Sequence, residues 1–161
     1  MKFKLRPYQE EASKKAVEFF LDEKKNWNAL EVLPTASGKS LILADIAARL
    51  KDKVLVFSPT KEILEQNYKK YCSYGFDNAS IYSASFKSKE ISDVTFATIG
   101  SVKGHPELFT DFKYILIDEV HLVKPESGMY KEFLDKLKSK VIGLTPQHLS
   151  VCIPIRTMVA Y

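Results

Sequence analysis

Cysteine and histidine are scarce in this sequence. The two cysteines, Cys72 and Cys152, have no metal-ligand spacing, and the three histidines, at positions 105, 121 and 148, form no cluster with them. A structural zinc site is therefore not expected, because such a site needs closely spaced Cys and His ligands. Two unrelated cysteines also give no disulfide framework, and we expect a protein of a reducing compartment.

Long apolar runs are absent as well. No stretch approaches the roughly 20 apolar residues that a membrane-spanning helix needs, and residues 1–6 lack the apolar core of a signal peptide. We therefore expect no membrane partner and a cytoplasmic location, in the host cytoplasm if the source is viral.

Charge of neither sign dominates the chain. The 24 Lys and Arg against 20 Asp and Glu give a formal net charge of +4, which permits contacts with nucleic-acid phosphates but does not demand them. With 45% hydrophobic and 27% charged residues among 161, the composition is that of a folded globular protein with one sizeable core.

The most informative stretch is Leu-Pro-Thr-Ala-Ser-Gly-Lys-Ser at residues 33–40. It follows a short apolar run at 29–33, typical of a buried strand, and precedes an Ala, Leu and Ile run at 41–50 of helical character. A phosphate-binding loop needs this strand-to-helix setting. The full pattern G-x-x-x-x-G-K-[ST] is not met, because position 33 is Leu, and a solvated Gly-Lys-Ser turn is the alternative interpretation.

The residues of this loop have the chemistry of a phosphate site. A glycine at position 38 lets the backbone approach phosphate oxygens, and the N–H groups of the loop and of the following helix start attract an anion. Lys39 is expected to reach the β- and γ-phosphates, and Ser40 offers a hydroxyl to Mg²⁺. The nucleotide-binding residues predicted from the loop are Pro34, Thr35, Ala36, Ser37, Gly38, Lys39 and Ser40.

A second motif, Asp-Glu-Val-His at 118–121, supports the first. It follows the continuous apolar run 114–117, which is typical of a parallel strand covered on both faces. The carboxyl end of such a strand is where open α/β sheets bind ligands. Asp118 is expected to hold Mg²⁺, directly or through water, and Glu119 to orient or activate the water that attacks the γ-phosphate. An acidic turn that caps a strand is the alternative.

Residues 34–40 resemble motif I of superfamily 2 helicases, and residues 118–121 resemble their DExH motif II. The resemblance extends from about residue 5 to Thr145, and it implies ATP as the nucleotide, with Mg²⁺. The string Leu-Arg-Pro-Tyr-Gln at 5–9 resembles the DNA-directed UvsW and xeroderma-B type more than the RNA-directed DEAD-box group. DNA is therefore the expected partner, and RNA is less favoured.

The resemblance also implies roles outside the two motifs. Gln9 would hydrogen-bond the N6 and N7 edge of adenine, whereas a solvated glutamine at a helix start is the alternative. His121 and Thr145 would couple the hydrolysis site to strand movement. Nucleic-acid contacts are implied for the positions of motifs Ia and Ib, which are Pro59, Thr60, Thr98, Gly100 and Ser101. A strand-to-helix turn capped by Thr60 explains the motif Ia residues without any ligand.

The predicted fold class is α/β, with a mainly parallel sheet flanked by helices, as in RecA-like P-loop NTPase domains. Residues 1–145 are predicted to form this ATP-binding lobe. The apolar runs predict strands at 29–33, 53–57, 93–98, 114–117 and 140–145. The helical spacing of apolar residues predicts helices after residue 9, at 41–50, at 61–74 and at 129–137.

Residues 146–161 depart from the family pattern. They show no helical period. Gln-His-Leu at 147–149 is what one set of codons for Ala-Thr-Pro, GCA-ACA-CCT, encodes when it is read one base later. We hypothesise a frame-shifted tail and hence the N-terminal fragment of a longer helicase. Translation of the other frames of the downstream DNA tests this, because a second helicase lobe should be encoded there. A naturally short protein with its own C-terminal strand is the alternative.

The predicted function is that of the first lobe of a superfamily 2 DNA helicase, which couples ATP hydrolysis to translocation or unwinding of nucleic acid. A chain of 161 residues holds one lobe. We therefore expect a second RecA-like lobe, supplied in cis by a longer parent or in trans, and weak activity of the isolated chain. Two other classes stay open: a truncated non-catalytic module that binds DNA or a partner, and the motor subunit of a restriction-type ATPase.

Overall fold

The computed structural model describes residues 4–34, 38–122, 128–146 and 156–160. Its helices are α1 (Pro7–Leu21), α2 (Lys39–Leu50), α3 (Lys61–Ser73), α4 (Ile99–Val102) and α5 (Met129–Asp135), and its 3₁₀ helices are η1 (Ala84–Phe86), η2 (Pro106–Phe109) and η3 (Val120–Leu122). Its strands are β1 (Ala29–Val32), β2 (Val54–Phe57), β3 (Ala79–Ser83), β4 (Ser88–Lys89), β5 (Val94–Ala97), β6 (Tyr114–Ile117), β7 (Lys140–Thr145) and β8 (Arg156–Ala160).

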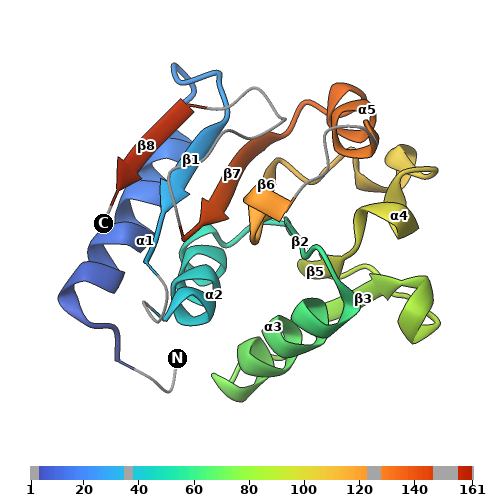
Figure 1. Cartoon of the computed structure of the whole chain (residues 1–161), viewed down its shortest axis with the longest axis horizontal. Helices are drawn as coiled ribbons and strands as arrows, with labels where there is room; N and C mark the ends of the chain where they lie inside the picture. The colour runs from blue at the N-terminus through green and yellow to red at the C-terminus, as the bar shows by residue number, and fades with distance from the viewer. Residues whose placement is uncertain (1–3, 35–37, 123–127, 147–155, 161) are drawn as a thin grey trace.

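The strands of the described residues form one eight-stranded sheet, in the order β4-β3-β5-β2-β6-β7-β1-β8 (Figure 1). Neighbouring strands run parallel, except that β3 and β4 are antiparallel. Parallel strands end at the same edge of a sheet, so the segments that follow β1, β2, β5 and β6 emerge there together. Only β7 separates β1, which leads into the phosphate loop, from β6, which leads into the acidic motif.

The central strands are apolar on both faces because the sheet is covered on both sides. In β2, Val54 and Val56 face a core shared with α1, α2 and α3, whereas Leu55 and Phe57 face a core shared with α4, η2 and α5. All four side chains are fully buried. A strand of this kind has no polar face, and its sequence is therefore a continuous apolar run.

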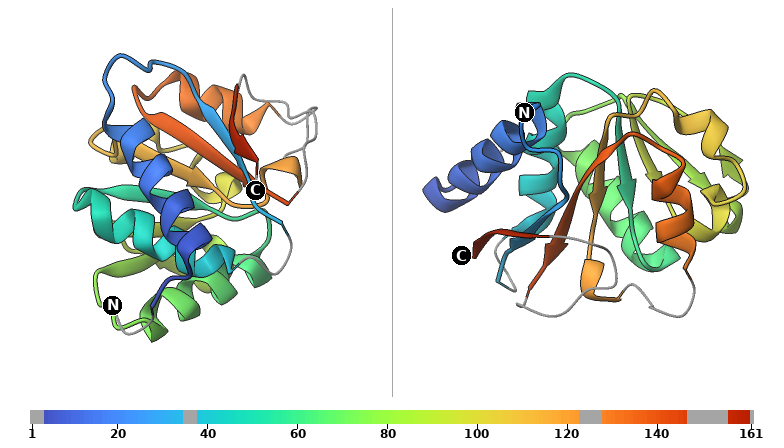
Figure 2. Two further views of the ribbon diagram at one scale, coloured as in Figure 1. Left: turned by 90° about the vertical axis from the view of Figure 1, so that its left-hand side faces the viewer. Right: turned by 90° about the horizontal axis from the view of Figure 1, so that it is seen from above.

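The first core is built on small residues of α1. Ala12 and Ala16 let the helix approach closely, and Phe19 and Phe20 fill the space toward β1 and β6. α1 and α2 lie side by side in both views of Figure 2. Burial of each large apolar side chain contributes about 1.5–3 kcal/mol. Among the described residues, no helix combines the length and the apolar character that crossing a bilayer requires.

Aromatic rings hold the second core together. The ring of Phe57 in β2 meets Tyr130 and Phe133 of α5 edge-on, at centroid distances of 5.3 and 5.6 Å. Phe109 of η2 contacts Phe133 from the other side, at 6.0 Å. Edge-to-face pairs of this kind add about 0.5–1.5 kcal/mol each beyond their buried area. These contacts fix α5 against the carboxyl half of β2.

The structure confirms the predicted α/β fold with a mainly parallel sheet. Each strand predicted from an apolar run is present, and α2 begins two residues before the predicted 41–50. β7 ends at Thr145, and β8 pairs in parallel with β1, so the sheet includes a strand of the predicted tail. The boundary between 1–145 and 146–161 and the frame-shifted origin of the tail stay predictions. Residues 147–149 lie outside the described part of the chain.

Candidate nucleotide-binding site

A cavity of about 660 Å³ lies at the carboxyl edge of the sheet. The predicted loop residues Pro34, Gly38, Lys39 and Ser40 line it from one side, and Glu119, which follows β6, lines it from another. Its remaining wall includes Gln66, Lys70 and Tyr74, from α3 and the residue after it. Two motifs that are far apart in sequence therefore meet at one cavity. Thr35, Ala36 and Ser37 lie outside the described residues.

Gly38 is required for two separate reasons. Its φ is +76°, in the left-handed region that L side chains rarely adopt, and it is the residue that caps the start of α2. A Cβ at this position would also lie 2.2 Å from Nε2 of Gln9. The loop and the first turn of α1 therefore touch at this point, and a side chain here would have to displace the Gln9 amide.

Gln9 is buried rather than solvated, with 5% of its surface exposed. Its Oε1 accepts a hydrogen bond from the backbone N–H of Arg6 at 2.8 Å, which fixes the side chain at the start of α1. The structure therefore excludes the solvated alternative for Gln9. Adenine recognition by this amide stays a prediction.

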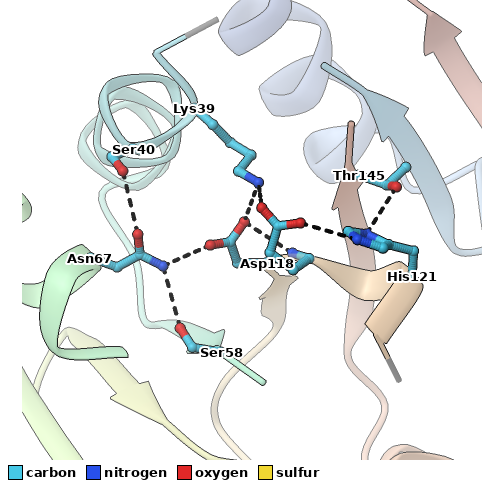
Figure 3. Close-up of polar contacts among 8 residues, drawn as sticks. Lys39, Ser40, Ser58, Asn67, Asp118, His121 and Thr145 are labelled. Carbon is cyan, nitrogen blue, oxygen red and sulfur yellow. Dashed lines mark hydrogen bonds and ion pairs between the residues drawn. The ribbon is translucent and has the colours of Figure 1, made fainter. Parts of the chain in front are cut away.

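Lys39 lies between the two carboxylates of the acidic motif (Figure 3). Its Nζ is 3.1 Å from Oδ1 of Asp118, and it forms an ion pair and hydrogen bond with Oε1 of Glu119. Asp118 is almost fully buried, with 4% of its side chain exposed, and Glu119 is 22% exposed. One ammonium group faces two carboxylates, so this trio carries an excess negative charge that favours a cation.

The backbone is strained where the acidic motif leaves β6. The N–H of Asp118 still donates to the carbonyl of Phe57 at 2.9 Å, as in the β2–β6 ladder, but Glu119 has a φ of +52°. A residue with a Cβ adopts this conformation at a cost of about 1–2 kcal/mol. Glu119 N–H donates to Oδ1 of Asp118 at 3.0 Å, which helps to hold the turn. Such strain persists where the surrounding structure requires it, commonly at functional sites.

Asn67 is a site residue that the motif comparison did not identify. Its Nδ2 donates to Oδ2 of Asp118 at 2.8 Å and to Oγ of Ser58 at 3.3 Å, and its Oδ1 accepts from Oγ of Ser40 at 3.3 Å (Figure 3). A sequence signal existed, since Asn67 lies three residues after Leu64 and four before Tyr71, on the inward face of α3. A polar residue in such an apolar stripe needs hydrogen-bond partners.

The predicted coupling residues are also brought together. Nδ1 of His121 and Oγ1 of Thr145 are 3.2 Å apart, and Nε2 of His121 is 3.4 Å from Oε2 of Glu119. The approach of η3 to β7 depends on glycine, because a Cβ at Gly143 would lie 2.9 Å from Cγ1 of Val120. His121 thus connects the acidic motif to the end of β7, and its coupling role stays a prediction.

The residues predicted to contact nucleic acid lie at the same edge of the sheet, after β2 and β5. Oγ1 of Thr60 accepts from the N–H of Ile63 at 3.2 Å, so the capping interpretation of Thr60 is confirmed. Oγ of Ser101 is 3.0 Å from Oγ1 of Thr98 and also accepts from a backbone N–H of η1. A Cβ added at Gly100 would meet open space. Contact of these residues, and of Pro59, with nucleic acid stays a prediction.

The donor set of the cavity suits Mg²⁺ rather than a metal bound by protein alone. Among the described residues, no group of three or more His, Cys, Asp or Glu side chains could hold a metal ion. Mg²⁺ usually takes one or two protein oxygens and completes its shell with water and substrate phosphates. Ser40 and Asp118 supply such oxygens and are joined through Asn67. The residues present therefore fit the ion that the sequence predicts.

The comparison with protein families gives a match over most of the chain. The sequence profile described as "Type III restriction enzyme, res subunit" matches residues 2–146. None of the curated proteins compared with the chain matches it in sequence. The matched range contains both motifs and ends one residue after Thr145.

Three solved structures of similar fold each belong to a chain larger than this one. The UvsW helicase from bacteriophage T4 matches with a TM-score of 0.71 and 24% identity, over 90% of this chain and 53% of that one. The SWI2/SNF2 ATPase core of Sulfolobus solfataricus, solved with double-stranded DNA, matches with a TM-score of 0.73 and 22% identity, over 92% and 33%. The Type ISP restriction-modification enzyme LlaGI was solved as a nuclease-deletion mutant with a DNA substrate mimic. It matches with a TM-score of 0.65 and 18% identity, over 90% of this chain and 18% of that one. The chain thus spans about half, or less, of the length of these proteins.

Proposed function

Because this chain belongs to the family of the type III restriction enzyme res subunit and has the RecA-like fold of superfamily 2 helicases, we propose that it is the ATP-binding lobe of a DNA-dependent motor. The observation that carries the proposal is the position of Lys39 between Asp118 and Glu119, at the carboxyl edge of the sheet. A lysine that follows a glycine of positive φ and faces two carboxylates has the chemistry of a nucleoside triphosphate site.

In this proposal the chain's own residues bind and orient the nucleotide. Lys39 exchanges its carboxylate partners for the β- and γ-phosphates, and the backbone N–H groups at the start of α2 face the same oxygens. Gln9, already held against Gly38, faces the adenine edge. Mg²⁺, held by Ser40 and Asp118, would neutralise the charge that develops on the phosphates.

Glu119 is the residue placed to orient the attacking water. Its carboxylate lies next to Lys39 and to His121, so its direction is fixed by neighbours. His121 and Thr145 would then link this carboxylate to the end of β7 and, in the complete machine, to a second lobe. The complete machine needs that lobe, because in ATPases of this type an arginine supplied from outside the site is worth about 10³–10⁵ in rate.

DNA is the nucleic acid that we propose as the partner, and RNA is less favoured. The predicted contact residues, at the ends of β2 and β5, lie at the same edge of the sheet as the phosphate cavity. The SWI2/SNF2 core and the restriction enzyme of similar fold were both solved with DNA or a DNA mimic. A second RecA-like lobe, in cis or in trans, would close over the cavity and complete the DNA path.

ATP turnover by the purified chain, with and without single-stranded and duplex DNA, tests this function together with binding of a fluorescent ATP analogue. We expect weak binding that Lys39→Ala abolishes, because the ammonium group is the main cation of the cavity. Glu119→Gln should retain binding and lower turnover, since the amide cannot activate water. Lys14→Ala, on the exposed face of α1, is the matched control. Binding that is unchanged in Lys39→Ala would refute the site.

The family match favours one further assignment. The matching family is that of the res subunit of a type III restriction enzyme, and LlaGI is another restriction enzyme with this fold. The chain would in that case drive translocation for a nuclease and not unwind DNA. Stimulation of ATP turnover by duplex DNA, with no strand separation when a second lobe is added, would favour the restriction motor over the helicase.

A further inference from the structure

The side chain of Asn67 contacts three other segments of the chain at the site. It is 6% exposed, and its one amide group contacts Ser40 of the phosphate loop, Asp118 of the acidic motif and Ser58 at the end of β2. These three partners come from three different segments of the chain. The amide is therefore in a position to set the geometry between them.

The direction of the amide follows from its partners. Asp118 is ion-paired with Lys39 and, as a carboxylate, only accepts hydrogen bonds, so the N–H side of Asn67 must face it. The second N–H of the same nitrogen faces Oγ of Ser58. The carbonyl oxygen of Asn67 is thereby turned toward Ser40.

This direction determines where the proton of the Ser40 hydroxyl lies. An amide oxygen only accepts, so Ser40 must donate its hydrogen to Asn67, and the lone pairs of Ser40 stay available on the other side. The same amide fixes Oδ2 of Asp118, which leaves Oδ1 facing Lys39. Both oxygens that the proposed function assigns to Mg²⁺ are therefore oriented by one neighbour.

We propose that Asn67 is a positioning residue for the cation of this site: it turns the lone pairs of Ser40 and the carboxylate of Asp118 toward one shared ligand. The inference rests on the proposed function, because it concerns the Mg²⁺ that accompanies the nucleotide. Partners that orient the ligands of a metal are commonly worth 10–100-fold in metal affinity. The competing interpretation is that Asn67 only satisfies buried polar groups and supports α3.

The two interpretations differ in what Mg²⁺ does. We would measure binding of a fluorescent ATP analogue to the full chain, in EDTA and across a Mg²⁺ titration, for Asn67→Ala and Asn67→Leu. The Mg²⁺ concentration for half-maximal enhancement should rise about 10–100-fold in both variants, while affinity in EDTA stays the same. Asn78→Ala is the matched control, because it removes a 2.7 Å hydrogen bond to Tyr71 of α3, and neither residue lines the cavity. Urea unfolding of each variant establishes that the variant is folded before its Mg²⁺ requirement is compared with that of the wild type.

Two results would overturn the role of Asn67 alone. An unchanged Mg²⁺ requirement in both folded variants would show that Ser40 and Asp118 need no such neighbour. An equal loss of affinity in EDTA and in Mg²⁺ would show that Asn67 supports only the loop. Failure of the proposed function looks different, since the wild-type chain would then bind no nucleotide or show no response to Mg²⁺.

Discussion

Glu31 is buried in the middle of β1. Its side chain has 0% exposure, and neither carboxylate oxygen has a hydrogen-bond partner among the described residues. Burial raises the pKa of Glu31 to about 8, against the smaller opposing effect of Lys15. The folded protein thus holds this carboxyl protonated at neutral pH. We expect Glu31→Gln to raise the free energy of unfolding at neutral pH, because the amide is neutral in both states.

The size of this effect follows from the two pKa values of Glu31. In the unfolded chain the carboxyl ionises near 4.5, and in the folded chain it keeps its proton up to about 8. Between these values the folded state binds more protons, so stability falls as the pH rises, by roughly 1.4 kcal/mol per pH unit. Relative to a glutamate with an unchanged pKa, the free energy of unfolding is lower by roughly 3 kcal/mol at pH 7 and by less than about 1 kcal/mol at pH 5. Glu31→Gln removes this slope.

Urea unfolding at pH 5, 7 and 8 measures the difference. The free energy of unfolding that Glu31→Gln gains over wild type should grow across this series. Glu18 is an exposed glutamate of α1, and Glu18→Gln should have nearly the same stability as wild type at any pH. A gain of equal size at pH 5 and pH 8 would contradict the raised pKa of Glu31. A loss of stability at every pH would show that Glu31 has a partner that an amide cannot replace.

Three other substitutions test the packing around the site, each by the free energy of unfolding in urea. Gly143→Ala should cost about 1–3 kcal/mol, because the added methyl meets Val120. Adding Val120→Ala should restore most of this loss. If Gly143→Ala alone is neutral, η3 moves freely. Gly38→Ala should cost at least about 1–2 kcal/mol from its positive φ alone, and an unchanged stability would refute that backbone conformation. Thr60→Ala should cost about 1 kcal/mol through loss of the α3 cap, and Thr60→Ser should retain most of the stability; equal loss in both would exclude the hydroxyl as the cause.

Local patterns predicted most of the fold because the central strands are buried on both faces. Runs such as Val54–Phe57 and Tyr114–Ile117 have no polar member, and their type and position can be read without knowing their neighbours. β8 could not be located in this way. Its place in the sheet depends on pairing with β1, more than 120 residues earlier, and the residues around it show no period. Pairing at such separation is set by tertiary contact.

The sequence predicted where the motif residues lie in the fold, but it did not predict the contacts between them. Lys39, Asp118 and Glu119 follow strand ends, and strand ends meet at one edge of a parallel sheet. Asn67 belongs to no motif, and its importance comes from three partners that only the folded chain brings together. The local sequence around Glu31 likewise does not predict its burial, because that burial depends on α1 and on the strands on both sides of β1.

Lys39 has one ammonium group and two sets of partners that compete for it. In the structure it is paired with Asp118 and Glu119, and in the proposed function it is paired with phosphate oxygens. A nucleotide therefore competes with carboxylates of the same chain, and its apparent affinity falls by the fraction of molecules in which the internal ion pair is closed. The acidic residues to which the proposed function assigns hydrolysis thus also raise the nucleotide concentration at which the site is half saturated.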